Sequence, residues 1–155
     1  MRLADILAVE RVCTCVQATD KAGVLRELAR LFTGLDEEEV LRVLVERERL
    51  ASTGVGSGVA IPHGRIRGTD RVLAAVAIAP AGIPFDSVDG RPATILVAVL
   101  APDHNAGEHL RALARLSRIL RDPAVRDRLL AARDPADALE VLLAEDARQG
   151  ASLSV

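Results

Sequence analysis

The sequence predicts a single α/β domain in which helices flank a mixed central β-sheet. Two near-continuous apolar runs, at residues 72–79 and 94–100, are each followed by a proline and have the length of strands covered on both faces. A shorter strand is expected at 12–16, and segments around these runs carry apolar residues at helical spacing. The 155 residues, half of them apolar, suffice for one well-packed domain and are too few for two.

Two helices are expected before the first long strand. The first starts at Thr19 or Asp20 and runs to about Phe32. The second starts at Asp36, and Glu39 lies three residues later, where it can complete a capping box. Both helices are therefore predicted to precede the glycine-rich stretch at residues 52–64.

The last third of the chain is also expected to be helical. Leucines recur at helical spacing over residues 110–120. Further helices start at Asp122-Pro123 and Asp134-Pro135, because aspartate caps a helix N-terminus and proline fits its first position. We assign residues 1–148 to the domain and expect residues 149–155 to form a flexible tail.

Composition excludes several functions. The net charge of -2 gives no global basic field for nucleic acid, and the chain has two Phe but no Tyr or Trp on which bases could stack. No segment approaches the ~20 apolar residues of a transmembrane helix, and the N-terminus lacks a secretory signal. We therefore expect a cytoplasmic protein with no direct membrane insertion. Cys13 and Cys15, one residue apart, support neither a disulfide framework nor a four-ligand zinc site.

The stretch STGVGSGVAIPHG, at residues 52–64, predicts the functional site. Its glycines permit unusual backbone conformations, and its proline restricts the backbone next to His63. Arg47 and Arg49 lie just upstream, and His109 starts a later helix. A neutral imidazole is a competent nucleophile near pH 7, guanidinium groups bind phosphate oxygens, and glycine-flanked N–H groups can form an anion-binding nest. The residues predict a site that receives an anion such as a phosphoryl group, although His63 could instead end a buried turn.

The run from Glu46 to Gly64 resembles the signature of a known family, together with residues 35–38, 88–92 and 108–110. The family is the fructose/mannitol/nitrogen-type enzyme IIA domain of the phosphoenolpyruvate-dependent phosphotransferase system, and its nitrogen-regulatory branch is the most similar. The resemblance covers essentially the whole chain. It implies a mixed sheet flanked by helices, in agreement with the elements above, and a phosphotransferase component with a phosphohistidine intermediate and no cofactor.

The resemblance also implies a role for each matching residue. His63 would be the phosphorylation site, normally at Nε2. Arg47 would bind the phosphoryl oxygens, and His109 would hydrogen-bond the phosphoryl group or the reacting imidazole. Phosphate-binding or supporting roles are expected for four further residues: Arg49, Ser52, Thr53 and Gly64.

Simpler interpretations remain open for several of these residues. Arg49 could be a solvated charge at the end of a helix, and His109 could be a capping or core histidine. Glu48 is expected to pair with an arginine or a backbone amide, and His104 to lie on the surface. We expect no metal site, because no His, Asp, Glu or Cys group shows the short spacings of zinc ligands.

The expected phosphoryl donor is an HPr-type carrier protein. The phosphoryl group would then pass to an enzyme IIB, or remain as a mark that changes binding to regulatory targets such as a transporter or a sensor kinase. No IIB or IIC domain is appended to the chain, which favours regulation. The alternatives are a sugar-transport enzyme IIA that works with a separate enzyme IIB, and a regulatory binding module that does not depend on phosphorylation.

Overall fold

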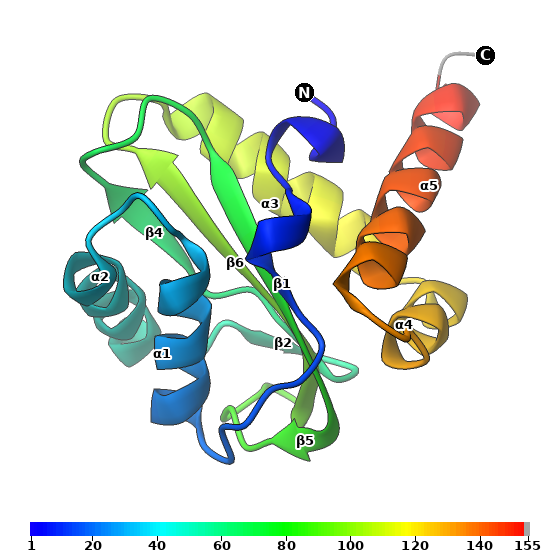
Figure 1. Cartoon of the computed structure of the whole chain (residues 1–155), viewed down its shortest axis with the longest axis horizontal. Coiled ribbons are helices and arrows are strands. Elements are labelled where there is room, and N and C mark those ends of the chain that lie inside the picture. The colour runs from blue at the N-terminus through cyan, green and yellow to red at the C-terminus, as the bar shows by residue number, and fades with distance from the viewer. Residues whose placement is uncertain (154–155) are drawn as a thin grey trace.

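Two long antiparallel strands, β5 (Leu73–Ile83) and β6 (Ala93–Pro102), form the centre of the sheet. The computed structural model, which describes residues 1–153, adds shorter strands on both sides of this pair (Figure 1). These are β1 (Val12–Cys13), β2 (Gly54–Gly56), β3 (Val59–Ala60) and β4 (His63–Ile66). The order is β1-β5-β6-β3-β2, and β4 also pairs with β6. Because β1 runs parallel to β5, and β3 and β4 run parallel to β6, while the β2–β3 and β5–β6 pairs are antiparallel, the sheet is mixed, as predicted.

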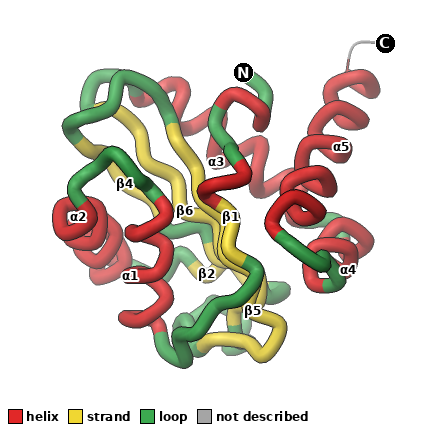
Figure 2. Tube along the Cα trace, in the orientation of Figure 1, coloured by secondary structure: helices red, strands yellow, loops and turns green. Residues whose placement is uncertain are grey.

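Helices cover both faces of the sheet (Figure 2). On one face lie α1 (Lys21–Leu31) and α2 (Glu37–Leu50), and on the other lie α3 (Ala106–Leu120), α4 (Pro123–Leu130) and α5 (Pro135–Leu153). Short 3-10 turns at Leu3–Asp5 and Val9–Arg11 precede β1. Alternate side chains of the central strands enter two apolar clusters, so that Val76 and Val97 face α3–α5 while Ala77 and Ala98 face α1 and α2. Burial on both faces explains why these strands read as continuous apolar runs.

The predicted helix starts are confirmed, with one difference. Asp20 accepts a hydrogen bond from the backbone N–H of Gly23, and Asp122 caps α4. Asp36 likewise accepts from the first N–H groups of α2. The Glu39 carboxylate, predicted to complete a capping box, pairs instead with Arg42 one turn further along the helix. Its ion pair with Arg42 therefore takes the place of the predicted bond to the cap backbone.

Three predicted boundaries differ from the structure. The strand at 12–16 is limited to Val12–Cys13, and β5 continues past Pro80, with irregular register before Ile83. The expected tail at 149–155 overlaps the end of α5, which continues through Leu153, and the Gln149 amide donates to Glu145. Residues 154–155 lie outside the described residues. Within residues 1–153, no helix is both long enough and apolar enough to cross a membrane.

Candidate functional site

His63 is the first residue of β4, and the sheet fixes its backbone. The residue pairs with Val99 of β6, whose backbone N–H donates to the carbonyl of Pro62 at 2.9 Å. The strands β3 and β4 follow one another along β6, separated by Ile61 and Pro62. Pairing with β6 thus fixes the backbone both before and after Pro62. The imidazole of His63 is half-buried.

One hydrogen bond decides which nitrogen of His63 is reactive. Nδ1 lies 2.7 Å from the carbonyl oxygen of Ile61, and a carbonyl can only accept. Nδ1 therefore carries the proton, and in the neutral ring Nε2 holds the free lone pair. Burial lowers the pKa of His63, and the charge of Arg47 acts in the same direction, while the bond to Ile61 opposes them. A neutral imidazole with an unprotonated Nε2 is the form required of a nucleophile.

His109 lies in the first turn of α3, with its ring beside that of His63. The ring centroids are 5.5 Å apart and the ring planes make an angle of 71°. The side chain is buried, and its Nε2 has no hydrogen-bond partner among residues 1–153. Burial, followed by the charges of His63 and Arg65, lowers the pKa of His109 to about 4. A buried, unpartnered ring nitrogen is costly and unusual, so its place beside His63 indicates a function.

Arg47 enters the same site from the end of α2. A groove of about 690 Å³ runs between α2, β4 and α3, and it is lined by Arg47, His63, Gly64, Arg65 and His109 among others. Nη1 of Arg47 donates to the carbonyl of Ala51 at 3.0 Å, which leaves the other guanidinium N–H groups available. The structure therefore brings together His63, His109 and Arg47, which the sequence placed in one site.

Gly64 allows α2 to approach β4. A Cβ at this position would overlap Cγ1 of Val43 on α2. Since Arg47 follows Val43 by one helical turn, close packing at Gly64 also sets how near Arg47 comes to His63. Gly64 lines the groove, and it supports the site because it has no side chain that would keep α2 away from β4.

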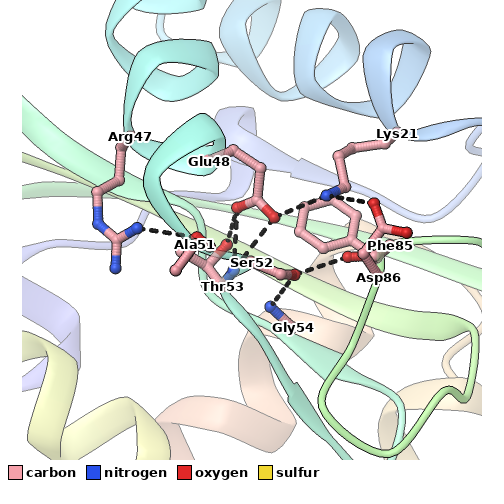
Figure 3. Close-up of polar contacts among 9 residues, drawn as sticks. All are labelled: Lys21, Arg47, Glu48, Ala51, Ser52, Thr53, Gly54, Phe85 and Asp86. Carbon is pink, nitrogen blue, oxygen red and sulfur yellow. Dashed lines mark hydrogen bonds and ion pairs between the residues drawn. The ribbon is translucent and has the colours of Figure 1, made fainter.

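The other predicted supporting residues lie outside the residues that line the groove. Ser52 Oγ donates to the carbonyl of Phe85 at 2.7 Å and accepts from the N–H of Gly54 (Figure 3). Thr53 is buried, and both its N–H and its hydroxyl donate to the carboxylate of Glu48. Arg49 is exposed. Ser52 and Thr53 hold the turn after α2, whereas Arg49 has no contact in the described chain that would link it to His63.

The predicted glycine nest is not the structure that forms. Gly54, Gly56 and Gly58 belong to the β2–β3 hairpin, and they are packed against Ser87, Asp89 and Thr94. Positive φ angles at Gly56 and Gly58 turn the hairpin, so the glycines serve the turn and its close packing. Their backbone does not line the groove at His63.

Two site features were not predicted from the sequence. Arg65 lines the groove because it lies two residues after His63 on the same strand, and alternate residues of a strand share a face. The second feature is the ion pair of Glu48 with the ammonium of Lys21, whereas its bond to the Thr53 backbone amide is one of the two partners expected from the sequence. His104 is exposed, as predicted. Within the described chain, no three His, Cys, Asp or Glu side chains are grouped to hold a metal ion.

Comparison with known proteins identifies the class to which this fold and site belong. The family model "Phosphoenolpyruvate-dependent sugar phosphotransferase system, EIIA 2" matches residues 5–145. The chain therefore belongs to this family, and it is a component of the phosphotransferase system.

Within the family, nitrogen regulatory proteins are among the similar relatives. One from Bradyrhizobium diazoefficiens is 38% identical over 137 residues, covering 86% of this chain and 90% of that protein. The crystal structure of nitrogen regulatory protein IIA-Ntr from Neisseria meningitidis superposes with a TM-score of 0.85 at 29% identity, covering 90% of this chain and 98% of that one. IIA mannitol from Escherichia coli, 24% identical over 88% of this chain and 98% of that one, shares the fold with a TM-score of 0.73. The predicted family and fold are confirmed.

Proposed function

We propose that this protein is a cytoplasmic phosphoryl carrier in which Nε2 of His63 accepts a phosphoryl group from a histidine-phosphorylated, HPr-type protein. One observation carries the proposal. The carbonyl of Ile61 holds the proton on Nδ1, which leaves the Nε2 lone pair of a half-buried, neutral imidazole as the nucleophile.

The transfer exchanges one N–P bond for another. Nε2 of His63 attacks phosphorus in line while the bond to the donor imidazole breaks, and the donor ring leaves with the bonding electron pair. The new phosphohistidine ring gains positive character, which the Nδ1–H bond to Ile61 stabilises. No metal or organic cofactor is needed for these steps.

Two side chains of the groove would stabilise the transferred group. The free N–H groups of Arg47 would bind the equatorial oxygens, where negative charge is spread in the transition state. When the neutral His109 ring carries its proton on Nε2, this unpartnered nitrogen would donate a hydrogen bond to a phosphoryl oxygen. The phosphoryl group would thereby give this buried nitrogen the partner that it lacks.

We propose regulation as the main use of the phosphoryl group. The nitrogen regulatory relative from Bradyrhizobium diazoefficiens is 38% identical over 86% of the chain. A fructose-specific EIIA component from Haloferax volcanii reaches 38% identity over 69% of it, and a fructose-specific EIIABC component from Bacillus subtilis covers 94% of it at 25% identity. Transfer to an enzyme IIB is the alternative. In Escherichia coli a IIA mannitol protein of the same fold forms a complex with phosphorylated IIB mannitol. The two uses share His63 and differ in whether the phosphate moves on.

NMR spectroscopy of protein labelled with ¹⁵N-histidine tests the chemistry at atomic level. Phosphorylation by phosphoenolpyruvate, enzyme I and HPr should introduce a phosphorus coupling at Nε2 of His63 while Nδ1 keeps its proton. A coupling at Nδ1, or on His109, would contradict the proposal. Addition of an enzyme IIB or of a regulatory target would then show whether the phosphate is lost or the binding affinity changes.

A further inference from the structure

Glu48 is a buried carboxylate next in sequence to the phosphate-binding arginine of the proposed site. Glu48 is only 7% exposed, and its side chain points away from that of Arg47 (Figure 3). The carboxylate accepts from the Thr53 N–H at 3.0 and 3.1 Å, from the Thr53 hydroxyl at 2.5 Å and from Lys21 Nζ at 2.9 Å. These donors compensate the buried charge, and the carboxylate in turn holds the groups that donate to it in place.

These bonds fix the turn that contains Ala51, whose carbonyl accepts a hydrogen bond from Arg47. Glu48 at the end of α2 and Thr53 at the end of the turn are tied together by three of the four bonds. Ala51 lies between them, and its carbonyl accepts from Nη1 of Arg47 at 3.0 Å. The position of the guanidinium therefore depends on the path of residues 51–53, and Glu48 sets that path.

Lys21 joins the turn to the rest of the fold. It is the one lysine in a chain that otherwise uses arginine, and its ammonium also pairs with Asp86 at 3.0 Å and lies 4.8 Å from the centre of the Phe85 ring. Ser52 Oγ donates to the carbonyl of the same Phe85. A compact ammonium can satisfy two carboxylates and a ring at once, which the planar fork of arginine fits less well.

We propose that Glu48 is a positioning residue that acts on phosphoryl transfer through Arg47, with Lys21 as its counter-charge. The proposal rests on the proposed function, in which His63 accepts the phosphoryl group and Arg47 binds it. Glu48 itself is placed to touch neither the phosphoryl group nor the donor, since it lies on the core side of the helix.

Glu48→Gln is the direct test, because it keeps the shape and removes the charge and one acceptor. The rate of phosphorylation by phospho-HPr at saturation should fall by about 10- to 100-fold, the usual cost of misplacing a binding group by about 1 Å. The KM for the carrier protein should change by less than about twofold, because the docking surface is intact. Glu38→Gln, at an exposed position in the first turn of the same helix, is the matched control and should leave the rate unchanged.

A double-mutant cycle separates positioning from simple loss of structure. In an Arg47→Ala background, Glu48→Gln should lower the rate of phosphorylation by less than about twofold, because the residue through which Glu48 acts is gone. Thr53→Val, which removes only the hydroxyl donor, should show the same pattern with a smaller loss and serves if Glu48→Gln fails to fold. Equal costs in both backgrounds would overturn the inference while leaving His63 as the acceptor. A wild type that takes up no phosphoryl group would overturn the proposed function and the inference together.

Discussion

The imidazole of His109 meets that of His63 nearly edge-on, with centroids 5.5 Å apart and ring planes at 71°. Both rings are shielded from solvent enough that burial is the main cause lowering each pKa. Protonation of either ring would place a positive charge against the other, and Arg47 and Arg65 add positive charge to the same groove. The site is thus organised to hold two neutral imidazoles and to receive negative charge.

The buried His109 should make stability depend on pH. Its pKa is about 4 in the folded protein, against an ordinary value of 6.5, so the unfolded chain binds a proton first as the pH falls. The His109 contribution is fully present above pH 6.5 and declines between pH 6.5 and 4, by roughly 3 kcal/mol in free energy of unfolding. Urea unfolding followed by circular dichroism at several pH values measures it. His109→Leu should lose this part of the pH dependence, and an unchanged slope would refute the assignment.

The charge of Arg47 should be visible in the titration of His63. The wild-type histidine should titrate below its ordinary value, and Arg47→Ala should raise its pKa, because a nearby cation that disfavours the imidazolium has been removed. ¹⁵N-histidine NMR across pH 4–8 follows the ring directly. Arg49→Ala is the matched control, since Arg49 does not line the groove. An equal shift of the His63 pKa in both variants would mean that Arg47 lies no closer to His63 than Arg49 does.

Arg47 and Arg49 should also differ in phosphotransfer. Arg47→Ala should slow phosphorylation of the protein by about 10²- to 10³-fold, which is the usual loss when one donor to transition-state charge is removed. Arg49→Ala should change the rate by less than about threefold, as expected for an exposed helix-end charge. Quenched-flow assays with phospho-HPr supply the rates. A large loss in Arg49→Ala would restore the direct role that the sequence allowed.

Packing at Gly64 predicts a pair of compensating substitutions. Gly64→Ala should destabilise the fold by about 1–3 kcal/mol, because the added methyl group overlaps Cγ1 of Val43. Val43→Ala removes that atom, so the double variant should be more stable than the sum of the single effects predicts. Thermal unfolding of the four proteins gives the coupling. Strict additivity would show that this contact does not limit the approach of α2 to β4.

Much of the fold was predictable because its signals are local. Aspartate caps mark the helix starts, and the two apolar runs mark β5 and β6. The hairpin β2–β3 was not foreseen because its glycines suit a tight turn and an anion nest equally well, and only their packing on the 87–94 segment decides between them. Helix α5 extends past Gln149, whose side-chain amide donates to Glu145 one turn earlier, a contact that the composition of the tail does not reveal.

The site was predicted in part for the same reason. His63 and Arg47 stand in a distinctive local pattern, and His109 was noted at the start of a later helix and received its predicted role from the family resemblance. Pairing of Glu48 with Lys21 joins positions 27 residues apart, and only the packing of α1 beside α2 brings them into contact. Ser52 and Thr53 carry hydroxyl groups suited to phosphate, yet the Ser52 hydroxyl donates to the carbonyl of Phe85 and the Thr53 hydroxyl donates to Glu48.

Intact-mass spectrometry after incubation with phosphoenolpyruvate, enzyme I and HPr tests the central claim most directly. The wild type should gain the mass of one phosphoryl group, and acid should remove it, because a phosphohistidine is acid-labile. His63→Ala should gain nothing, and His109→Leu should still be modified but more slowly, because it keeps the nucleophile. Absence of the adduct on the wild type with a functional carrier, or its persistence on His63→Ala, would contradict the account.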